Sequence, residues 1–169
     1  SKKMVEAIDY PDGTAEERAY DEWENQVYKK DRLGRETHWK YNAQGQLLQV
    51  ENPDGLITTH TYDEQGLCIH TQDNLGGEIC YTYTREGWLK GKKTKQSEGK
   101  WQVEAYEYDY QGRVLRKTVN GQETRYWYKE DSPVPCAMRT PCGDEFRYEY
   151  DAAYRLSVIA SEFGERSFG

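Results

Sequence analysis

Four aspartates that could act in catalysis or bind a cation recur along the chain, each directly after a tyrosine. They are Asp21, Asp63, Asp109 and Asp151. General acid–base catalysis needs two carboxyl groups that converge in one pocket, whereas acids repeated at one structural position lie in a row. An aspartate that opens a turn instead accepts hydrogen bonds from the backbone two residues later. Because Gly66 and Gly112 stand three residues after Asp63 and Asp109, the sequence favours a turn role over catalysis.

The three histidines are the next candidates for a metal site. They are His38, His60 and His70. His60 takes the place of an aromatic residue in a repeated pattern, so we expect a half-buried ring. His38 lies one position out of step with His60 in the preceding repeat, and successive residues of a strand point to opposite faces. The sequence also lacks the CxxC pair that is typical of structural zinc. It therefore predicts no metal site and no cofactor.

The cysteines could supply a nucleophile only beside a base. They are Cys68, Cys80, Cys136 and Cys142. A catalytic pair would need Cys68 or Cys80 beside His60 or His70, and their expected places in regular strands disfavour it. Phosphate-binding, dinucleotide-binding and nucleophile-elbow motifs do not occur. We expect free thiols, with a Cys136–Cys142 disulfide across one hairpin as the alternative. The sequence predicts no catalytic residues and hence no enzyme.

A regular period of tyrosines organises all of these residues. The recurring positions, about 20–25 residues apart, are Tyr20, Tyr41, Tyr62, Tyr83, Tyr108, Tyr128 and Tyr150. A second aromatic residue stands two positions before most of them, and residues two apart share one face of a β-strand. The pattern predicts an aromatic face made of Trp39, Tyr41, Tyr81, Tyr83, Tyr106, Tyr108, Tyr126, Tyr128, Tyr148 and Tyr150. Such a face either packs as cross-strand pairs or serves as a binding platform.

Turn signals follow these tyrosines and close each repeat into a hairpin. Asparagine or aspartate followed by glycine three residues later favours a type I turn with a bulge. The predicted turn residues are Asn42, Gly45, Asp63, Gly66, Asp109 and Gly112. A second turn closes each unit, for example at Asn120-Gly121. The sequence therefore predicts an all-β fold of tandem antiparallel β-hairpins with about 14 strands. Two stretches fit less well: residues 21–28 could form a short helix, and Pro133 and Pro135 weaken one strand.

Composition excludes several classes of protein. The net charge is −7, which disfavours nucleic acid as a partner. The sequence holds no apolar run of the length that spans a membrane, so we expect no membrane span. The 15 tyrosines and 5 tryptophans can bury the apolar surface that disordered chains lack. These features predict a folded, Tyr- and Trp-rich protein.

The segment Tyr-Asp-x-x-Gly-Arg-Val-Leu at residues 108–115 resembles the YD repeat of Rhs proteins. Residues 62–67 and 150–156 resemble it with one or more substitutions. The resemblance covers about residues 5–169 and implies successive β-hairpins in a strip that spirals into a hollow shell. In bacterial Rhs proteins and Tc-type toxins such a shell encloses a C-terminal toxin, and teneurins use a similar shell in cell adhesion.

The resemblance implies a function as well as a fold. We expect residues 1–169 to form one YD-repeat domain of about seven units and a segment of a larger shell. Its role would be a non-enzymatic scaffold that encloses a toxin or effector in a bacterial secreted or cell-surface protein. The expected partners are the rest of the shell or an enclosed polypeptide, and edge strands would favour self-association. The alternative is a binding module for carbohydrate or a partner protein that uses the aromatic face.

Overall fold

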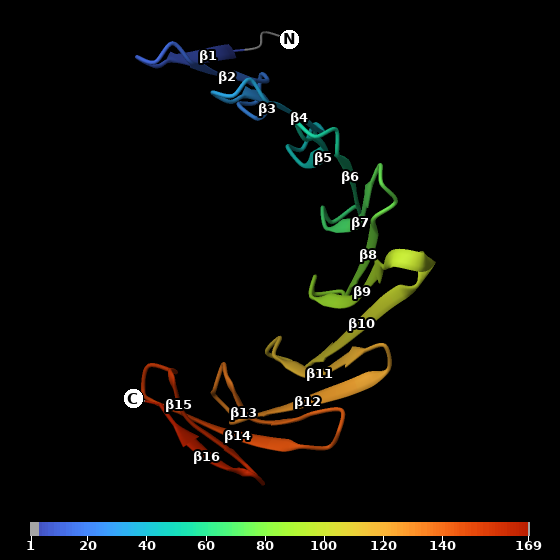
Figure 1. Ribbon diagram of the computed structural model, residues 1–169. Coiled ribbons are helices and arrows are strands. Elements are labelled where there is room, and N and C mark those ends of the chain that lie inside the picture. The colour runs from blue at the N-terminus through green and yellow to red at the C-terminus, as the bar shows by residue number, and fades with distance from the viewer. Residues whose placement is uncertain (1–3, 169) are drawn as a thin grey trace. The chain divides into compact units, whose positions relative to one another are not determined.

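The computed structural model describes residues 4–168 and contains sixteen β-strands. Each strand neighbours the next one in the sequence, so the strand order in the sheet is the order of the chain (Figure 1). The chain divides into two units, residues 1–80 and 81–169. The strands up to the boundary are β1 (Met4–Asp9), β2 (Ala15–Tyr20), β3 (Gln26–Lys30), β4 (Glu36–Tyr41), β5 (Leu47–Glu51), β6 (Ile57–Tyr62), β7 (Cys68–Asp73) and β8 (Glu78–Tyr83).

The second unit continues the same alternation of strands and turns. Its strands after β8 are β9 (Leu89–Lys95), β10 (Trp101–Tyr108), β11 (Val114–Val119), β12 (Gln122–Tyr128), β13 (Pro135–Arg139), β14 (Glu145–Tyr150), β15 (Leu156–Ser161) and β16 (Gly164–Ser167). The helical element of the described chain is a single 3-10 turn, Ser97–Gly99. The predicted all-β fold of tandem antiparallel hairpins is therefore confirmed. The expected 14 strands correspond to β2–β15, and β1 and β16 are additional.

The turns that follow six of the repeat tyrosines share one pair of backbone hydrogen bonds, and the turn after Tyr128 is the exception. The backbone N–H of Gly66 donates to Asp63 O (3.0 Å), and Asp63 N–H donates to Leu67 O (2.9 Å). The strand register shifts by a β-bulge between Thr61 and Tyr62, and Gly66 has a φ of +84°. Glycine adopts this left-handed conformation without a Cβ clash. The motif thus forms a type I turn with a glycine bulge.

The predicted short helix at residues 21–28 is wrong. The chain makes a turn after Asp21 and enters β3 at Gln26. Asp21 Oδ1 accepts hydrogen bonds from the backbone N–H of Trp23 (3.0 Å) and Asn25 (2.9 Å). These bonds hold the turn although Glu24 replaces glycine at φ +66°. The other irregular stretch forms β13 in spite of Pro135, because proline stands at its first residue, where strands tolerate it.

The sheet of each unit is a single layer. Among the residues whose burial is described, only Ala19 and Glu104 are buried, at 5% and 8% exposure. Alternating strand residues are half-buried and exposed, as in β4 and β14. A one-layer sheet leaves its more apolar face without a covering layer of its own. Burial here therefore depends on packing between neighbouring side chains along one face.

Tyr154 offers a test of the turn geometry. It replaces the turn glycine of its repeat with a φ of +57°, a conformation that costs an L-residue about 1 kcal/mol or more. We expect Tyr154→Gly to raise the free energy of unfolding by about 0.5–1 kcal/mol. Tyr110 is also an exposed turn tyrosine but lacks a positive φ. Tyr110→Gly should therefore destabilise the chain. Urea unfolding measures the free energy of unfolding of both variants. Equal changes in the two variants would contradict this interpretation.

Candidate functional site

The predicted turn residues bond within their own turns. Asn42 Oδ1 accepts from the backbone N–H of Gln44 (3.0 Å) and Gln46 (2.9 Å). Asp109 Oδ1 accepts from the backbone N–H of Gln111 (2.9 Å) and Arg113 (3.0 Å). Asp63 makes the same pair of bonds with Gln65 and Leu67, and Gly45 and Gly112 have φ near +77° and +81°. Every one of these groups is engaged in holding the backbone.

Several turn aspartates are held in the ionised form. For Asp109, burial raises the pKa, but hydrogen bonds from the backbone and side chain of Arg113 outweigh it, so the pKa lies below its ordinary value. The backbone N–H of Arg35 lowers the pKa of Asp31 most. The backbone N–H of Arg155 does the same for Asp151. A carboxylate that accepts such bonds stabilises the folded state while it stays ionised.

This linkage predicts loss of stability in acid. The contribution of a group with a lowered folded-state pKa is present above its unfolded value, 3.8 for aspartate, and is lost as the pH falls through the folded value. We expect Tm to be flat from about pH 7 to 5 and to drop below about pH 4. Since Asn42 forms the same turn, the triple variant D31N/D109N/D151N should keep the fold. The Tm of this variant should fall less steeply in acid than the Tm of the parent. Identical acid profiles would contradict the prediction.

The repeat tyrosines make a second set of contacts, between hairpins. The hydroxyl of Tyr62 donates to Leu47 O at 2.7 Å. In the second unit, Tyr108, Tyr128 and Tyr150 donate to the carbonyl oxygens of Leu89 (2.7 Å), Val114 (3.0 Å) and Pro135 (2.9 Å). Each acceptor is the first residue of a strand, and each tyrosine ends the next strand. At this edge of the sheet no turn joins the two strands. The tyrosine hydroxyl therefore holds their ends together.

Burial raises the pKa of these four tyrosines, because a partly buried phenol is harder to ionise. The hydroxyls consequently stay protonated and keep donating at neutral pH. We call these four bonds the tyrosine clamp.

Asparagines clamp strand ends at the opposite edge. Asn74 Oδ1 accepts from Ile57 N–H (3.0 Å), and Asn74 Nδ2 donates to Gly55 O (2.9 Å). Asn120 Oδ1 likewise accepts from Val103 N–H at 2.8 Å. The sequence predicted Asn120 as a turn residue only. The contacts of both asparagines across strands depend on which turns are neighbours in the sheet. The register of the strands sets that arrangement.

Arg113 joins the turn of one hairpin to the next. Its guanidinium binds Asp109 Oδ2 at 2.6 Å, and its Nη1 lies 2.9–3.2 Å from the carbonyl oxygens of Lys129, Glu130 and Ser132. It also lies 4.7 Å from the ring centre of Tyr128. Gln46 and Trp88 occupy the same place after their turns: Gln46 donates to Gly66 O (3.0 Å), and Trp88 packs on Tyr108. In these three repeats the residue at this place contacts the following hairpin.

The ten residues predicted for the aromatic face are all half-buried. Tyr148 and Tyr150 pack with ring centres 6.5 Å apart. The rings are neither fully enclosed nor fully exposed, so the face still presents apolar surface within each unit. The structure therefore leaves both the packing role and a binding role open to the aromatic face.

Glu104 is a charged residue among the rings of β10. Its carboxylate accepts from Tyr106 Oη (2.7 Å) and Gln102 Nε2 (3.1 Å) and lies 3.3 Å from Lys117 Nζ. The hydroxyl of Tyr106 is the largest cause that lowers the pKa of Glu104. A buried carboxylate with this many partners is satisfied. Its contacts are those of a structural residue.

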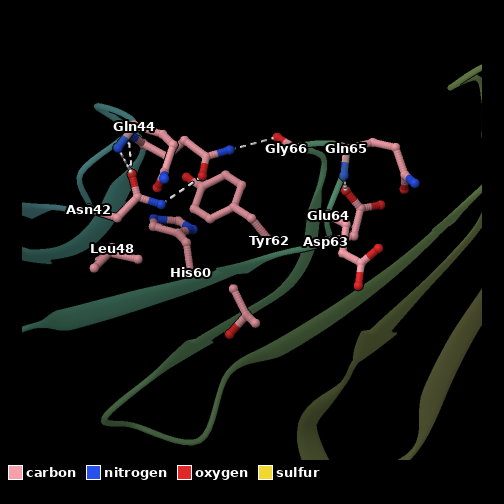
Figure 2. Close-up of a pocket in the computed structure, with 11 residues that line it drawn as sticks. Asn42, Gln44, Leu48, His60, Tyr62, Asp63, Glu64, Gln65 and Gly66 are labelled. Atoms are coloured by element: carbon pink, nitrogen blue, oxygen red, sulfur yellow. Dashed lines mark hydrogen bonds between the residues drawn. The ribbon is translucent and has the colours of Figure 1, made fainter.

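A shallow groove of about 770 Å³ lies in the first unit between two turns (Figure 2). His60 and Tyr62 form part of its wall beside Asn42 and Gly66. Burial lowers the pKa of His60, and its Nδ1 lies 3.0 Å from Thr71 Oγ1. Asn42 Nδ2 donates to Gln46 Oε1 at 2.6 Å. The Asn42 amide thus bonds within its own turn, and the His60 ring bonds a residue of β7.

The cysteines are thiols, and the alternative Cys136–Cys142 disulfide is not formed. His60 Nδ1 lies 3.0 Å from Thr71 Oγ1, and Cys68 Sγ lies 3.6 Å from the same hydroxyl oxygen. Among the described residues, no helix has the length and apolar character needed to cross a bilayer.

Comparisons with known proteins agree with this architecture. The RHS Repeat family model matches residues 41–78. The Tc holotoxin pore of Photorhabdus luminescens matches 94% of this chain with a TM-score of 0.72 and 17% identity. A TcdB2–TccC3 crystal structure matches 92% with a TM-score of 0.71 and 18% identity.

The chain spans about a tenth of each of these structures, 10% in both cases. No curated protein sequence matches the chain. At these identities the structural likeness shows a shared fold. Residues 41–78 thus match the RHS repeat, and the chain shares the fold of the matched regions of these toxin complexes.

Proposed function

We propose that this chain is a non-enzymatic scaffold, a segment of the wall of an Rhs-type shell that encloses a polypeptide. The polar residues that recur make structural bonds: turn aspartates hold turns, tyrosine hydroxyls hold strand ends, and Arg113 holds the next turn. The likeness to toxin complexes that contain TcdB2 and TccC3 supports the proposal. In this interpretation residues 1–169 act as one repeat domain within a longer protein.

The observation that carries the proposal is the half-buried aromatic face of a single-layer sheet. Stable domains bury such faces against a second layer. Within each unit the rings keep part of their surface exposed, and apolar patches of this kind mark surfaces that bind proteins. We infer that the aromatic face contacts the enclosed polypeptide, while the opposite face, richer in charged residues, faces solvent.

Adjacent residues on β12 allow a direct test. Tyr126 lies on the aromatic face and Trp127, 42% exposed, lies on the other face. We would place the photo-crosslinking residue p-benzoylphenylalanine at one position or the other in the complete gene product, expressed in its own cell. Crosslinking at position 126 should yield an adduct with a polypeptide encoded by the same gene.

Position 127 is the matched control and should give no such adduct. Equal melting temperatures for the two labelled proteins exclude misfolding as the cause of a difference. Adducts with polypeptide from position 127 alone would contradict the proposal. A face that forms no protein adduct but binds carbohydrate on a glycan array would also contradict it and support the binding-module alternative.

A further inference from the structure

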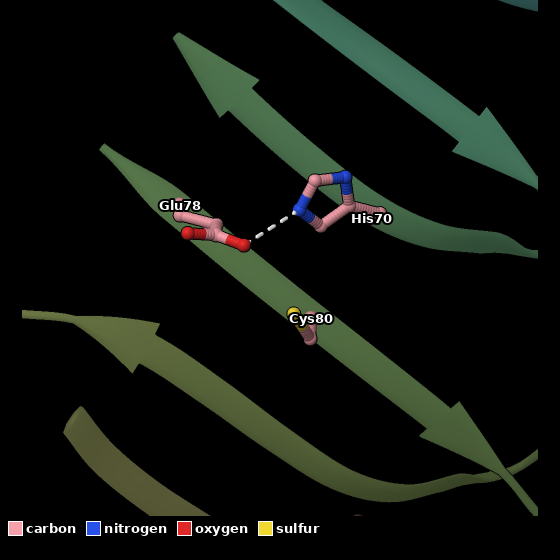
Figure 3. A group of neighbouring side chains, drawn as sticks. All are labelled: His70, Glu78 and Cys80. Atoms are coloured by element: carbon pink, nitrogen blue, oxygen red, sulfur yellow. Dashed lines mark hydrogen bonds and ion pairs between the residues drawn. The ribbon is translucent and has the colours of Figure 1, made fainter. Parts of the chain in front are cut away.

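Three side chains that bind metals in other proteins meet on β7 and β8 of the first unit (Figure 3). They are His70, Glu78 and Cys80. His70 Nε2 lies 3.1 Å from Glu78 Oε1, and the nitrogen, oxygen and sulfur donor atoms all lie within 4.8 Å of one another. The cluster is separate from the turns and from the aromatic face.

Strand geometry explains how the three residues meet. His70 pairs directly with Cys80 across the two strands, and Glu78 stands two residues before Cys80, on the same face of β8. The neighbouring Thr71 turns the other way, toward His60 on the aromatic face. The three side chains therefore lie on the face opposite the aromatic residues, where a cross-strand pair and its diagonal neighbour come within reach.

We propose that His70, Glu78 and Cys80 form a binding site for Zn²⁺. Zinc takes thiolate, imidazole and carboxylate ligands at about 2.0–2.3 Å in tetrahedral geometry, which sets the donor atoms about 3.2–3.6 Å apart. The His70–Glu78 distance of 3.1 Å lies just below this range. A side-chain rotation of Cys80 or Glu78 brings the remaining distances into this range.

The surroundings suit a site that ions can enter. The side chains of His70 and Glu78 are 30% and 31% exposed, so the cluster is accessible without being fully solvated. Three protein ligands leave one tetrahedral position for water or a further ligand. Bound Zn²⁺ would join β7 to β8 and so add a cross-link to the repeat scaffold.

Cobalt titration tests the site, since Co²⁺ occupies zinc sites and its thiolate complexes absorb in the near ultraviolet. The purified chain, reduced and freed of metal by a chelator, should bind one Co²⁺ with this absorption, and Zn²⁺ should displace it. Cys80→Ser should abolish the thiolate band. His70→Ala and Glu78→Gln should each weaken binding at least about tenfold.

Two controls separate this site from non-specific binding. His38 and Glu36 form a similar pair, with their side-chain atoms 3.6 Å apart, and Cys142 is the exposed cysteine. The variants His38→Ala and Cys142→Ser should therefore bind Co²⁺ as the parent does. Zn²⁺ should also raise the Tm of the parent and leave the Tm of His70→Ala unchanged. This comparison tests the zinc site even if Cys80→Ser fails to fold. Absence of the band at about 1 mM Co²⁺, or a band that survives Cys80→Ser, overturns the proposal.

Discussion

Replacing Arg113 by alanine is expected to lower the free energy of unfolding by about 3 kcal/mol. The side chain is only 16% exposed and binds three backbone carbonyl oxygens of the following turn. Hydrogen bonds from a charged donor contribute about 1.5–3 kcal/mol, and their loss leaves acceptors without a partner. Loss of the contact with the ring of Tyr128 adds to this effect.

Arg155 is a matched control for this substitution. It forms the same ion pair with an aspartate four residues earlier, also at 2.6 Å, but its side chain is 81% exposed. Exposed pairs of this kind contribute about 0–1 kcal/mol, so Arg155→Ala should have little effect. Urea unfolding compares the two variants. Equal losses would show that the contacts of Arg113 with the next turn do not stabilise the repeat array.

Removing the three hydroxyls of the tyrosine clamp in the second unit together should lower the free energy of unfolding by about 3 kcal/mol. The triple variant is Y108F/Y128F/Y150F, which keeps every ring and removes the bonds to Leu89 O, Val114 O and Pro135 O. Each bond is expected to contribute about 1 kcal/mol. The three bonds lie in different hairpins, so their effects should be close to additive.

Tyr148 provides the control in the same strand as Tyr150. Its hydroxyl contacts the sulfur of Met138 at 3.8 Å, a weak acceptor. Tyr148→Phe should therefore leave Tm within about 1 °C of the parent, whereas the triple variant should melt far lower. If Tyr148→Phe and the single clamp variants shift Tm equally, the rings rather than the hydroxyl bonds hold the hairpins together.

The hairpins could be predicted because their signals are local. A turn such as Asp109–Gly112 depends on bonds within four or five residues, and the spacing of two within an aromatic pair fixes which face of a strand they share. The same reasoning missed that Glu24 and Tyr154 adopt positive φ without glycine. There the turn bonds of Asp21 and Asp151 override the preference of the fourth residue.

Contacts between strands could not be predicted in the same way. The Asn74 clamp, the carbonyl acceptors of the tyrosines and the meeting of His70 with Cys80 all depend on register. A shift of one residue would place His70 on the opposite face. Candidate sites whose residues come from different strands therefore became visible only in the structure. The aromatic pairs could be predicted because both residues of a pair lie on one strand.

A cryo-electron microscopy structure of the complete gene product tests the scaffold role most directly. We predict that residues 4–168 form part of a continuous β-strip, with the aromatic face toward density for an enclosed polypeptide of the same gene. Tyr81, Tyr106 and Tyr126, half-buried here, should become covered. A structure in which these tyrosines face bulk solvent, or surround a bound small-molecule substrate, would contradict the proposed function.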